Sequence, residues 1–319
     1  MTNYVIKRLL LFIPTLFLVS LVIFFIMRII PGDLALMILA GPTGEGNYTQ
    51  EDLERVQAMI GTDQRLHIQY LKWAGGVFQG DFGQIFFYNV AVIDELKTRV
   101  PVTLELTVLA ILIAFVVSVP LGVISAVKQD TWADYGAKLF TVAGVALPTF
   151  WVGILLVLFL SRVFGWLPPL GYAKLWEDPL KNLQQLIFPA LALGYYNMAF
   201  TARITRSSML EVLRDDYIRT ARSKGLHEMM VIGRHALKNA LMPVIAVSGW
   251  QFSRLLGGAV LIEIIFTVPG MGHMLVDSIL HRDFNAVQAV ILLVAAFVLF
   301  LNLLVDVING WLDPRVRYA

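Results

Sequence analysis

The residues best suited to bind a ligand are charged side chains that interrupt long apolar runs. Arg254 stands near the middle of such a run, flanked by Gln251 and Ser253 and followed by Gly257 and Gly258. A charge in lipid is costly unless it is paired or hydrated. Arg254 is therefore either part of an ion pair inside a helix bundle or a residue that lines a water-filled pathway. In a pathway, its guanidinium could hold a carboxylate or another anionic group.

Three acidic residues also lie in or near apolar runs. Glu263 follows Arg254 by about two and a half helical turns, and we expect Arg254, Gln251 and Glu263 to line a pathway. Glu105 and Asp306 lie near the ends of their runs, where a charged side chain commonly reaches the membrane interface.

The sequence carries no catalytic or nucleotide-binding motif. It has no Gly-Lys dipeptide and hence no P-loop, and it contains neither H-E-x-x-H nor G-x-S-x-G. Its five histidines lack metal-ligand spacing, and the absence of cysteine removes thiolate nucleophiles and Cys-ligated metals. We expect this chain not to be an enzyme, and to bind no metal or cofactor of its own.

The composition is typical of a membrane protein. Hydrophobic residues make up 58% of the 319 residues and charged residues 15%, against roughly 45–50% and 25% in a soluble domain. The mean hydropathy is +0.72. The net charge of +2 is too small for a protein that binds nucleic acid through its phosphates. The sequence thus predicts an all-α integral membrane protein.

Six apolar runs are long enough to form transmembrane helices. The first begins after Lys7 and Arg8 and is longer than the apolar part of a signal peptide, so we expect it to remain as a span. Prolines occur within or beside several of the runs, which is compatible with kinked helices. The runs cover residues 9–27, 102–127, 139–164, 186–200, 240–262 and 286–308.

Basic residues set the expected orientation. In the short connections they gather on the side of the N-terminus, and an excess of Lys and Arg marks the cytoplasmic side. Both termini should therefore be cytoplasmic. The residues on that side are Lys7, Arg8, Lys128, Lys138, the cluster from Arg203 to Lys238, Arg315 and Arg317.

The segment between the first two spans, residues 31–101, should form a small extracytoplasmic cap. Thr49 and Asp52 make a capping signal for a helix that runs through Ile60 and stops at Gly61. A second helix is expected over 64–77, followed by a turn at the G-D-F-G sequence of residues 80–83.

Residues 211–239, between the fourth and fifth spans, combine many charges with interleaved apolar residues. Such a pattern is expected for a surface helix that packs against another element, and Gly225 falls where such a helix could turn. On the pattern alone, however, a solvated loop that follows the positive-inside rule is the favoured interpretation.

Taken together, these segments resemble the permease subunit of a bacterial ATP-binding-cassette (ABC) importer of the dipeptide and oligopeptide permease family. The strongest match is Y-I-R-T-A-R-S-K-G-L at 217–226, followed by H-A-L-K-N-A-L-M-P at 235–243. Arg219, Thr220 and Ala221 stand where the family's EAA loop has Glu-Ala-Ala, and Gly225 matches its glycine. Weaker matches in the family's order are I-P-G-D at 30–33, G-D-F-G at 80–83, L-P-T-F at 147–150, L-P-P-L-G at 167–171, L-G-G-A-V at 256–260, P-G-M-G at 269–272 and D-P-R at 313–315.

The resemblance implies the fold of a type I ABC importer (MetI-like) transmembrane domain with six transmembrane helices. It divides the chain into an N-terminal span with the cap (residues 1–100), a five-helix core (101–310) that contains the cytoplasmic loop 211–239, and a tail (311–319). It also implies that this loop forms a coupling helix that docks on an ATPase. The coupling residues would be Asp216, Tyr217, Arg219, Thr220, Ala221, Arg222, Lys224, Gly225 and Leu226.

The resemblance further implies a set of partners in the bacterial inner membrane. These are a second homologous permease subunit, two cytoplasmic ABC ATPases that bind ATP and Mg²⁺, and an extracytoplasmic solute-binding protein, with membrane lipid around the spans. The family's solutes include dipeptides, oligopeptides, glutathione, nickel chelates and oligosaccharides, and the residues of this chain leave the solute open. Two alternatives need no ATPase: a stand-alone secondary transporter or channel, and a membrane-embedded enzyme.

Overall fold

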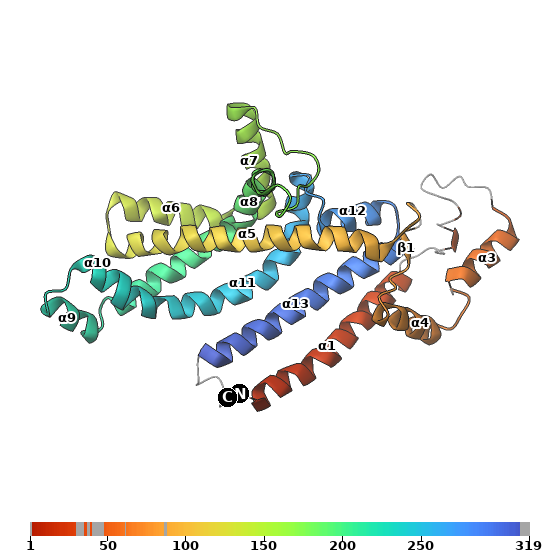
Figure 1. Ribbon diagram of the computed structural model, residues 1–319, viewed down its shortest axis with the longest axis horizontal. Coiled ribbons are helices and arrows are strands. Elements are labelled where there is room, and N and C mark those ends of the chain that lie inside the picture. The colour runs from red at the N-terminus through yellow and green to blue at the C-terminus, as the bar shows by residue number, and fades with distance from the viewer. Residues whose placement is uncertain are drawn as a thin grey trace. The chain divides into compact units, whose positions relative to one another are not determined.

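The computed structural model of the chain describes residues 2–29, 35–36, 39, 48–60, 62–85 and 88–312 (Figure 1). The motif at 30–33, the stop signal at Gly61 and the tail from 313, with Arg315 and Arg317, lie outside the described residues. The described part is dominated by helices, as the apolar runs predict.

The elements follow one another in this order: α1 (Thr2–Ile29), α3 (Gln50–Ile60), α4 (Leu66–Phe78), β1 (Gln84–Ile85), β2 (Val90–Ala91), α5 (Val92–Val127), α6 (Trp132–Ala146), α7 (Thr149–Phe164), α8 (Pro179–Val212), α9 (Asp216–Ser223), α10 (Glu228–Met230), the π-helical turn η1 (Val231–Ala236), α11 (Leu237–Ile265), α12 (Met271–Leu280) and α13 (Phe284–Leu312).

The contacts within the chain divide it into two compact units. The first comprises residues 1–102 and 269–303, and the second comprises 103–268 and 304–319. The long helices α5 and α13 each contribute residues to both units. The segment predicted to couple to a partner and the run that contains Arg254 both fall in the second unit.

In the first unit, the loop helices form where the sequence predicts them. Thr49 and Asp52 make the reciprocal capping box: Asp52 N donates to Thr49 Oγ1 at 3.2 Å, and Thr49 N donates to Asp52 Oδ2 at 3.1 Å. The helix α3 follows directly, and α4 lies within two residues of the expected bounds. α4 packs on α1, where the rings of Phe24 and Tyr70 meet edge to face at 5.4 Å.

The predicted turn at residues 80–83 is confirmed. Gly80 and Gly83 have φ of +81° and +82°, which L side chains rarely adopt, and Gly83 N donates to Asp81 Oδ1 at 2.9 Å. The short antiparallel pair β1–β2 follows, a feature not predicted from the sequence. Ile85 of β1 packs against Leu96, Met271 and Met274 in a buried apolar cluster.

Three of the described helices are long and apolar enough to cross a membrane: residues 8–29 of α1, 92–127 of α5 and 284–307 of α13. The bent pair α6–α7 would add a fourth if it is one span. The predicted runs at 186–200 and 240–262 lie inside α8 and α11. The chain thus has the helices of a multi-pass membrane protein.

The predicted apolar run 139–164 does not form one continuous helix. The run breaks at Leu147 and Pro148 into α6 and α7, whose axes differ by 115°. Leu147 has an extended backbone, with φ −87° and ψ 132°, because the proline ring clashes with an α-helical residue before it. By contrast, Pro120 and Pro189 lie within the unbroken helices α5 and α8.

In the second unit, α8 is the helix around which the others pack. It contacts α6, α7 and α11, and many of its side chains are buried. Gly194 lets α5 approach closely, since a Cβ added there would lie 2.7 Å from the carbonyl oxygen of Ala110. Small residues at such crossings are typical of helices packed within a membrane.

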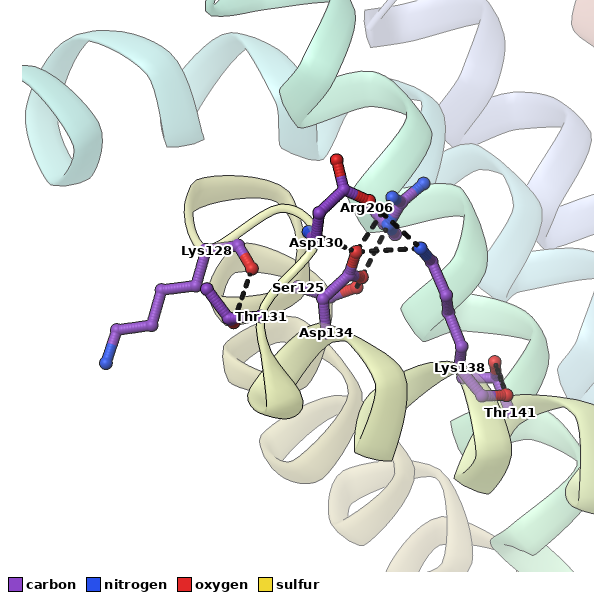
Figure 2. A network of polar contacts seen from close by, with 8 residues as sticks. All are labelled: Ser125, Lys128, Asp130, Thr131, Asp134, Lys138, Thr141 and Arg206. Atoms are coloured by element: carbon purple, nitrogen blue, oxygen red, sulfur yellow. Dashed lines mark hydrogen bonds and ion pairs between the residues drawn. The ribbon is translucent and has the colours of Figure 1, made fainter.

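A buried carboxylate joins α5, α6 and α8 where α5 ends and α6 begins (Figure 2). Asp134 is fully buried and accepts hydrogen bonds from Ser125 Oγ at 2.5 Å and from the backbone N of Asp130 at 3.1 Å. It also pairs with Lys138 Nζ at 2.8 Å and Arg206 Nε at 3.2 Å. Because Arg206 belongs to α8, the cluster ties that helix to α5 and α6.

Candidate functional site

The segment predicted to couple to a partner folds as the short helix α9 with one buried face. Ile218 and Ala221, spaced by three residues, are buried and pack on Met209, Val231 and Ala236. Residues three apart on a helix share a face, so this spacing directs the other side chains of α9 away from the core. Asp216, Tyr217, Arg219, Thr220 and Arg222 are exposed.

The end of α9 is fixed by a Schellman motif. Leu226 N donates to the carbonyl of Ala221 at 3.4 Å, and Gly225 N donates to the carbonyl of Arg222 at 2.9 Å. Gly225 has φ +77°, the left-handed conformation that this motif requires. Lys224 is the C-cap residue and is exposed, whereas Leu226 turns back toward the apolar cluster under α9.

Two polar contacts hold the segment in place. Arg222 forms a bidentate pair with Glu228, at 2.7 Å from Nη2 to Oε1 and 3.2 Å from Nε to Oε2. The Arg222 guanidinium lowers the pKa of Glu228 below its ordinary value. Tyr217 Oη accepts a hydrogen bond from Asn239 Nδ2 at 2.7 Å, which links α9 to α11.

The result is an exposed polar surface on a packed apolar base. Arg219 and Asp216, paired at 3.3 Å, are both largely exposed, and Thr220 and Lys224 are exposed beside them. Such a surface is suited to docking on another protein. The π-helical turn η1 that follows was not predicted, although π-turns are frequent at functional sites.

A second candidate site is a cavity of about 460 Å³ between α8 and α11. Two of the three predicted pathway residues, Gln251 and Arg254, line it. The third, Glu263, is not among its described lining residues: its buried carboxylate accepts a hydrogen bond from Thr103 Oγ1 at 2.6 Å.

One wall of the cavity is aromatic. The rings of Tyr196 and Phe200 on α8 stack with their centroids 6.1 Å apart and an angle of 11° between the planes. The Arg254 guanidinium lies over the Tyr196 ring at 5.8 Å, and that of Arg203 lies over Phe200 at 5.8 Å. Sequence reasoning missed both rings, although their spacing of four residues on one helix could have indicated a shared face.

Gln251 is fixed by a contact across the two helices. Its side chain is buried, and its Oε1 accepts a hydrogen bond from Thr201 Oγ1 at 3.1 Å. Within the described part of the chain, its Nε2 has no hydrogen-bond partner. Among the described residues, no group of three or more His, Asp or Glu side chains is placed to hold a metal ion.

Two family models match the chain. The one described as binding-protein-dependent transport system inner membrane component matches residues 118–318. The model for the N-terminal part of such membrane components matches residues 1–107.

Similar proteins align over the whole chain. A peptide transport system permease protein, so named, of Brucella abortus (strain 2308) is 41% identical over 318 residues, which is 100% of both chains. The glutathione transport system permease protein GsiC of Escherichia coli (strain K12) is 40% identical over 318 residues, again 100% of both.

A solved structure shares the fold. The crystal structure of an amino acid ABC transporter with histidines matches 68% of this chain and 94% of its own, with a TM-score of 0.54 and 16% identity. The family model covers well over half of the chain, and the full-length relatives extend the match to both ends. The chain therefore belongs to the family of binding-protein-dependent transport system inner membrane components, and within it to the permeases of peptide-type ABC importers.

Proposed function

We propose that this permease carries small peptides or closely related solutes, and that partner ATPases drive it through α9. The relatives are named for peptide and for glutathione transport, and glutathione is itself a small peptide. The chemistry shared by both is a short solute with amide groups and free carboxylates. A cavity that presents a cation, amides and aromatic rings suits such a solute.

The complete importer, in this proposal, has four further subunits. A second permease completes the pathway, two ATPases bind ATP and Mg²⁺ on the cytoplasmic side, and a binding protein delivers the solute from outside. The chain crosses the inner membrane six times, with both termini and α9 in the cytoplasm and residues 31–101 outside. The gathering of basic residues on one side of the predicted spans supports this orientation.

The observation that carries the coupling role is the construction of α9. Its apolar face is buried, its end is locked by the Schellman motif at Gly225, and its polar face is exposed. A helix can transmit a partner's motion only if it makes different contacts in the partner's two states. Exposed residues on a firmly anchored helix meet that requirement, because a force on α9 reaches α8 and α11 through packed side chains.

Charge reversal on α9 tests this role. Arg219→Glu changes an exposed side chain of the docking face, and Lys181→Glu makes the same change on an exposed side chain at the start of α8. Tagged protein is purified from mild detergent together with its partners. We expect Arg219→Glu to keep the second permease and lose the ATPases, and Lys181→Glu to keep both.

The other outcomes are equally informative. If Arg219→Glu retains the ATPases and full ATP-driven transport, α9 is not the docking element. If the wild-type chain purifies alone or as a homo-oligomer and still transports, the chain is a stand-alone transporter.

A further inference from the structure

We propose that Gln251 and Arg254 together form a receptor for a free carboxylate of the transported solute. This inference rests on the proposed function and deepens it, because it names the chemical group by which the permease itself recognises its solutes. In this proposal the permease, and not only its binding protein, favours peptides whose carboxyl end is ionised.

Gln251 has a side-chain donor that the described residues leave unused. Thr201 Oγ1 donates to Oε1, so the amide oxygen is occupied and the NH₂ end is left. Within the described residues, Nε2 has no acceptor, although the side chain is only 4% exposed and lines the cavity. Buried donors are nearly always paired in folded proteins, so a donor held in this way indicates a place for an acceptor from outside the chain.

Arg254 lies on the same side of α11 as that donor. Residues 251 and 254 are three apart on α11, and such residues lie on the same face of a helix. Both line the cavity. The guanidinium lies over the Tyr196 ring, 5.8 Å from its centroid, so the aromatic face places the cation at this wall of the cavity. An ionised acceptor between the two residues would receive charge-assisted hydrogen bonds.

The charge of the cavity lining also suits a carboxylate. Among the described residues that line it, Arg254 carries the only formal charge, and the remaining residues are Thr149, Leu193, Tyr196, Asn197, Phe200, Gln251, Leu255 and Gly258. One cation with one amide donor matches a single carboxylate. A cationic group placed beside Arg254 would be repelled.

The neighbouring rings have a complementary role. The Tyr196–Phe200 stack offers an apolar wall to the side chain of a bound solute without selecting one side chain strongly. This arrangement would recognise the carboxylate and accept different neighbouring side chains, as a transporter of several related peptides requires.

The test compares a dipeptide with its carboxyl-terminal amide in proteoliposomes that contain the whole importer, with the binding protein at saturating concentration for both forms. The acid-to-amide ratio of transport rates is measured for wild type and for Arg254→Gln. Dividing the two ratios cancels the preference of the binding protein, which is the same in both. We expect the acid-to-amide ratio of wild type to be at least five times that of Arg254→Gln. Equal ratios in wild type and Arg254→Gln would overturn the proposal.

Further variants separate recognition from folding. Gln251→Glu, which places a carboxylate where the donor was, should reduce transport of the acid more than that of the amide, and Arg254→Lys should retain part of the preference. Thr201→Val removes the contact that orients the amide and should shift the ratio less than Gln251→Leu does. The matched control is Gln288→Leu, a buried glutamine whose Nε2 also lacks a partner among the described residues but which does not line this cavity.

The outcomes distinguish the inference from the function beneath it. If wild type transports both forms and no variant changes the acid-to-amide ratio, Gln251 and Arg254 are not a carboxylate receptor. The proposed function as a peptide permease would still stand. If wild type transports neither form although the assembled complex hydrolyses ATP, peptides are not the solute. The proposed carboxylate receptor would then be refuted as well. Gln288→Leu should match wild type in the acid-to-amide ratio, and an equal loss of preference in that control would also refute the proposal.

Discussion

The carboxylate of Asp134 is wholly buried and lies 3.2 Å from Nε of Arg206, whose side chain is a quarter exposed. This pair joins α6 to α8 about one and a half turns before α8 ends and leads into α9. The base on which α9 rests is therefore held by an ion cluster as well as by apolar packing. A substitution at Asp134 should therefore alter the docking segment α9 and also lower the stability of the protein.

Asp134→Asn should destabilise the protein by about 1–3 kcal/mol, since Asn keeps the shape but loses the charge that Lys138 and Arg206 face. The larger cost of breaking a fully buried pair does not apply, because both cations are partly exposed to solvent. The measurement is the melting temperature of the purified chain in detergent.

The matched control is Asp130→Asn. Asp130 is four residues away, its side chain is 81% exposed, and its φ of +57° suits Asn as well as Asp. Its melting temperature should stay close to that of wild type. If the two variants melt alike, the buried charge at Asp134 does not stabilise this junction.

The pair of Arg222 and Glu228 predicts a dependence on pH. Hydrogen bonds from Arg222 lower the pKa of Glu228 from its ordinary value of 4.5. The pair therefore stabilises the segment fully above pH 4.5, and its contribution is lost as the pH falls through the lowered pKa of the folded state. Both side chains are about half exposed, so the contribution is at most about 1 kcal/mol.

Amide hydrogen exchange over residues 224–230 measures this effect. At pH 7, Glu228→Gln should exchange faster than wild type in this segment, and the difference should shrink as the pH falls below 4.5. Glu177→Gln, which removes a carboxylate in another loop, should leave exchange of residues 224–230 unchanged over the same range. A difference between wild type and Glu228→Gln that does not shrink with falling pH would contradict the assignment.

The local elements could be predicted because their signals are local. Thr49 and Asp52 predict the start of α3 through two reciprocal hydrogen bonds that need no other part of the chain. Gly225 indicates the end of α9 because few other residues adopt its φ. The apolar runs, likewise, predict helices because the backbone in lipid must satisfy its own hydrogen bonds.

The break at Leu147 and Pro148 could not be predicted from hydropathy. Pro120, Pro148 and Pro189 all lie in apolar surroundings, and only one of them ends a helix. Whether a helix tolerates a proline depends on what its neighbours offer the freed carbonyl groups, and this is a property of the packed structure. The contact between Tyr196 and Arg254 could not be predicted either, because the two residues come from different helices and meet only in the packed structure.

Helical geometry separates Glu263 from the other two predicted pathway residues. Successive residues of a helix are separated by about 100°, so Glu263, nine residues after Arg254, points to the opposite side of α11. Gln251, three residues before Arg254, shares its face. The structure follows this geometry: Gln251 and Arg254 line the cavity, whereas Glu263 is bonded to Thr103.

Gly225→Ala tests whether the shape of α9's end matters for coupling. At φ +77° an L side chain costs roughly 1–2 kcal/mol, although a Cβ at this position would meet nothing within 4 Å. The substitution therefore strains the backbone without creating a clash, and it should disfavour the Schellman turn that fixes the helix. We expect ATP-driven transport to fall several-fold while the chain still folds and assembles with its second permease.

Gly233→Ala is the matched control for this change. Gly233 is also exposed, also has nothing within 4 Å of an added Cβ, and lies in the helical turn η1 without a positive φ. Alanine at a helical position is neutral or slightly favourable relative to glycine, so transport should remain at the wild-type rate. Equal losses in the two variants would mean that the segment merely resists any added side chain. Loss in Gly225→Ala alone ties coupling to the left-handed turn that ends α9.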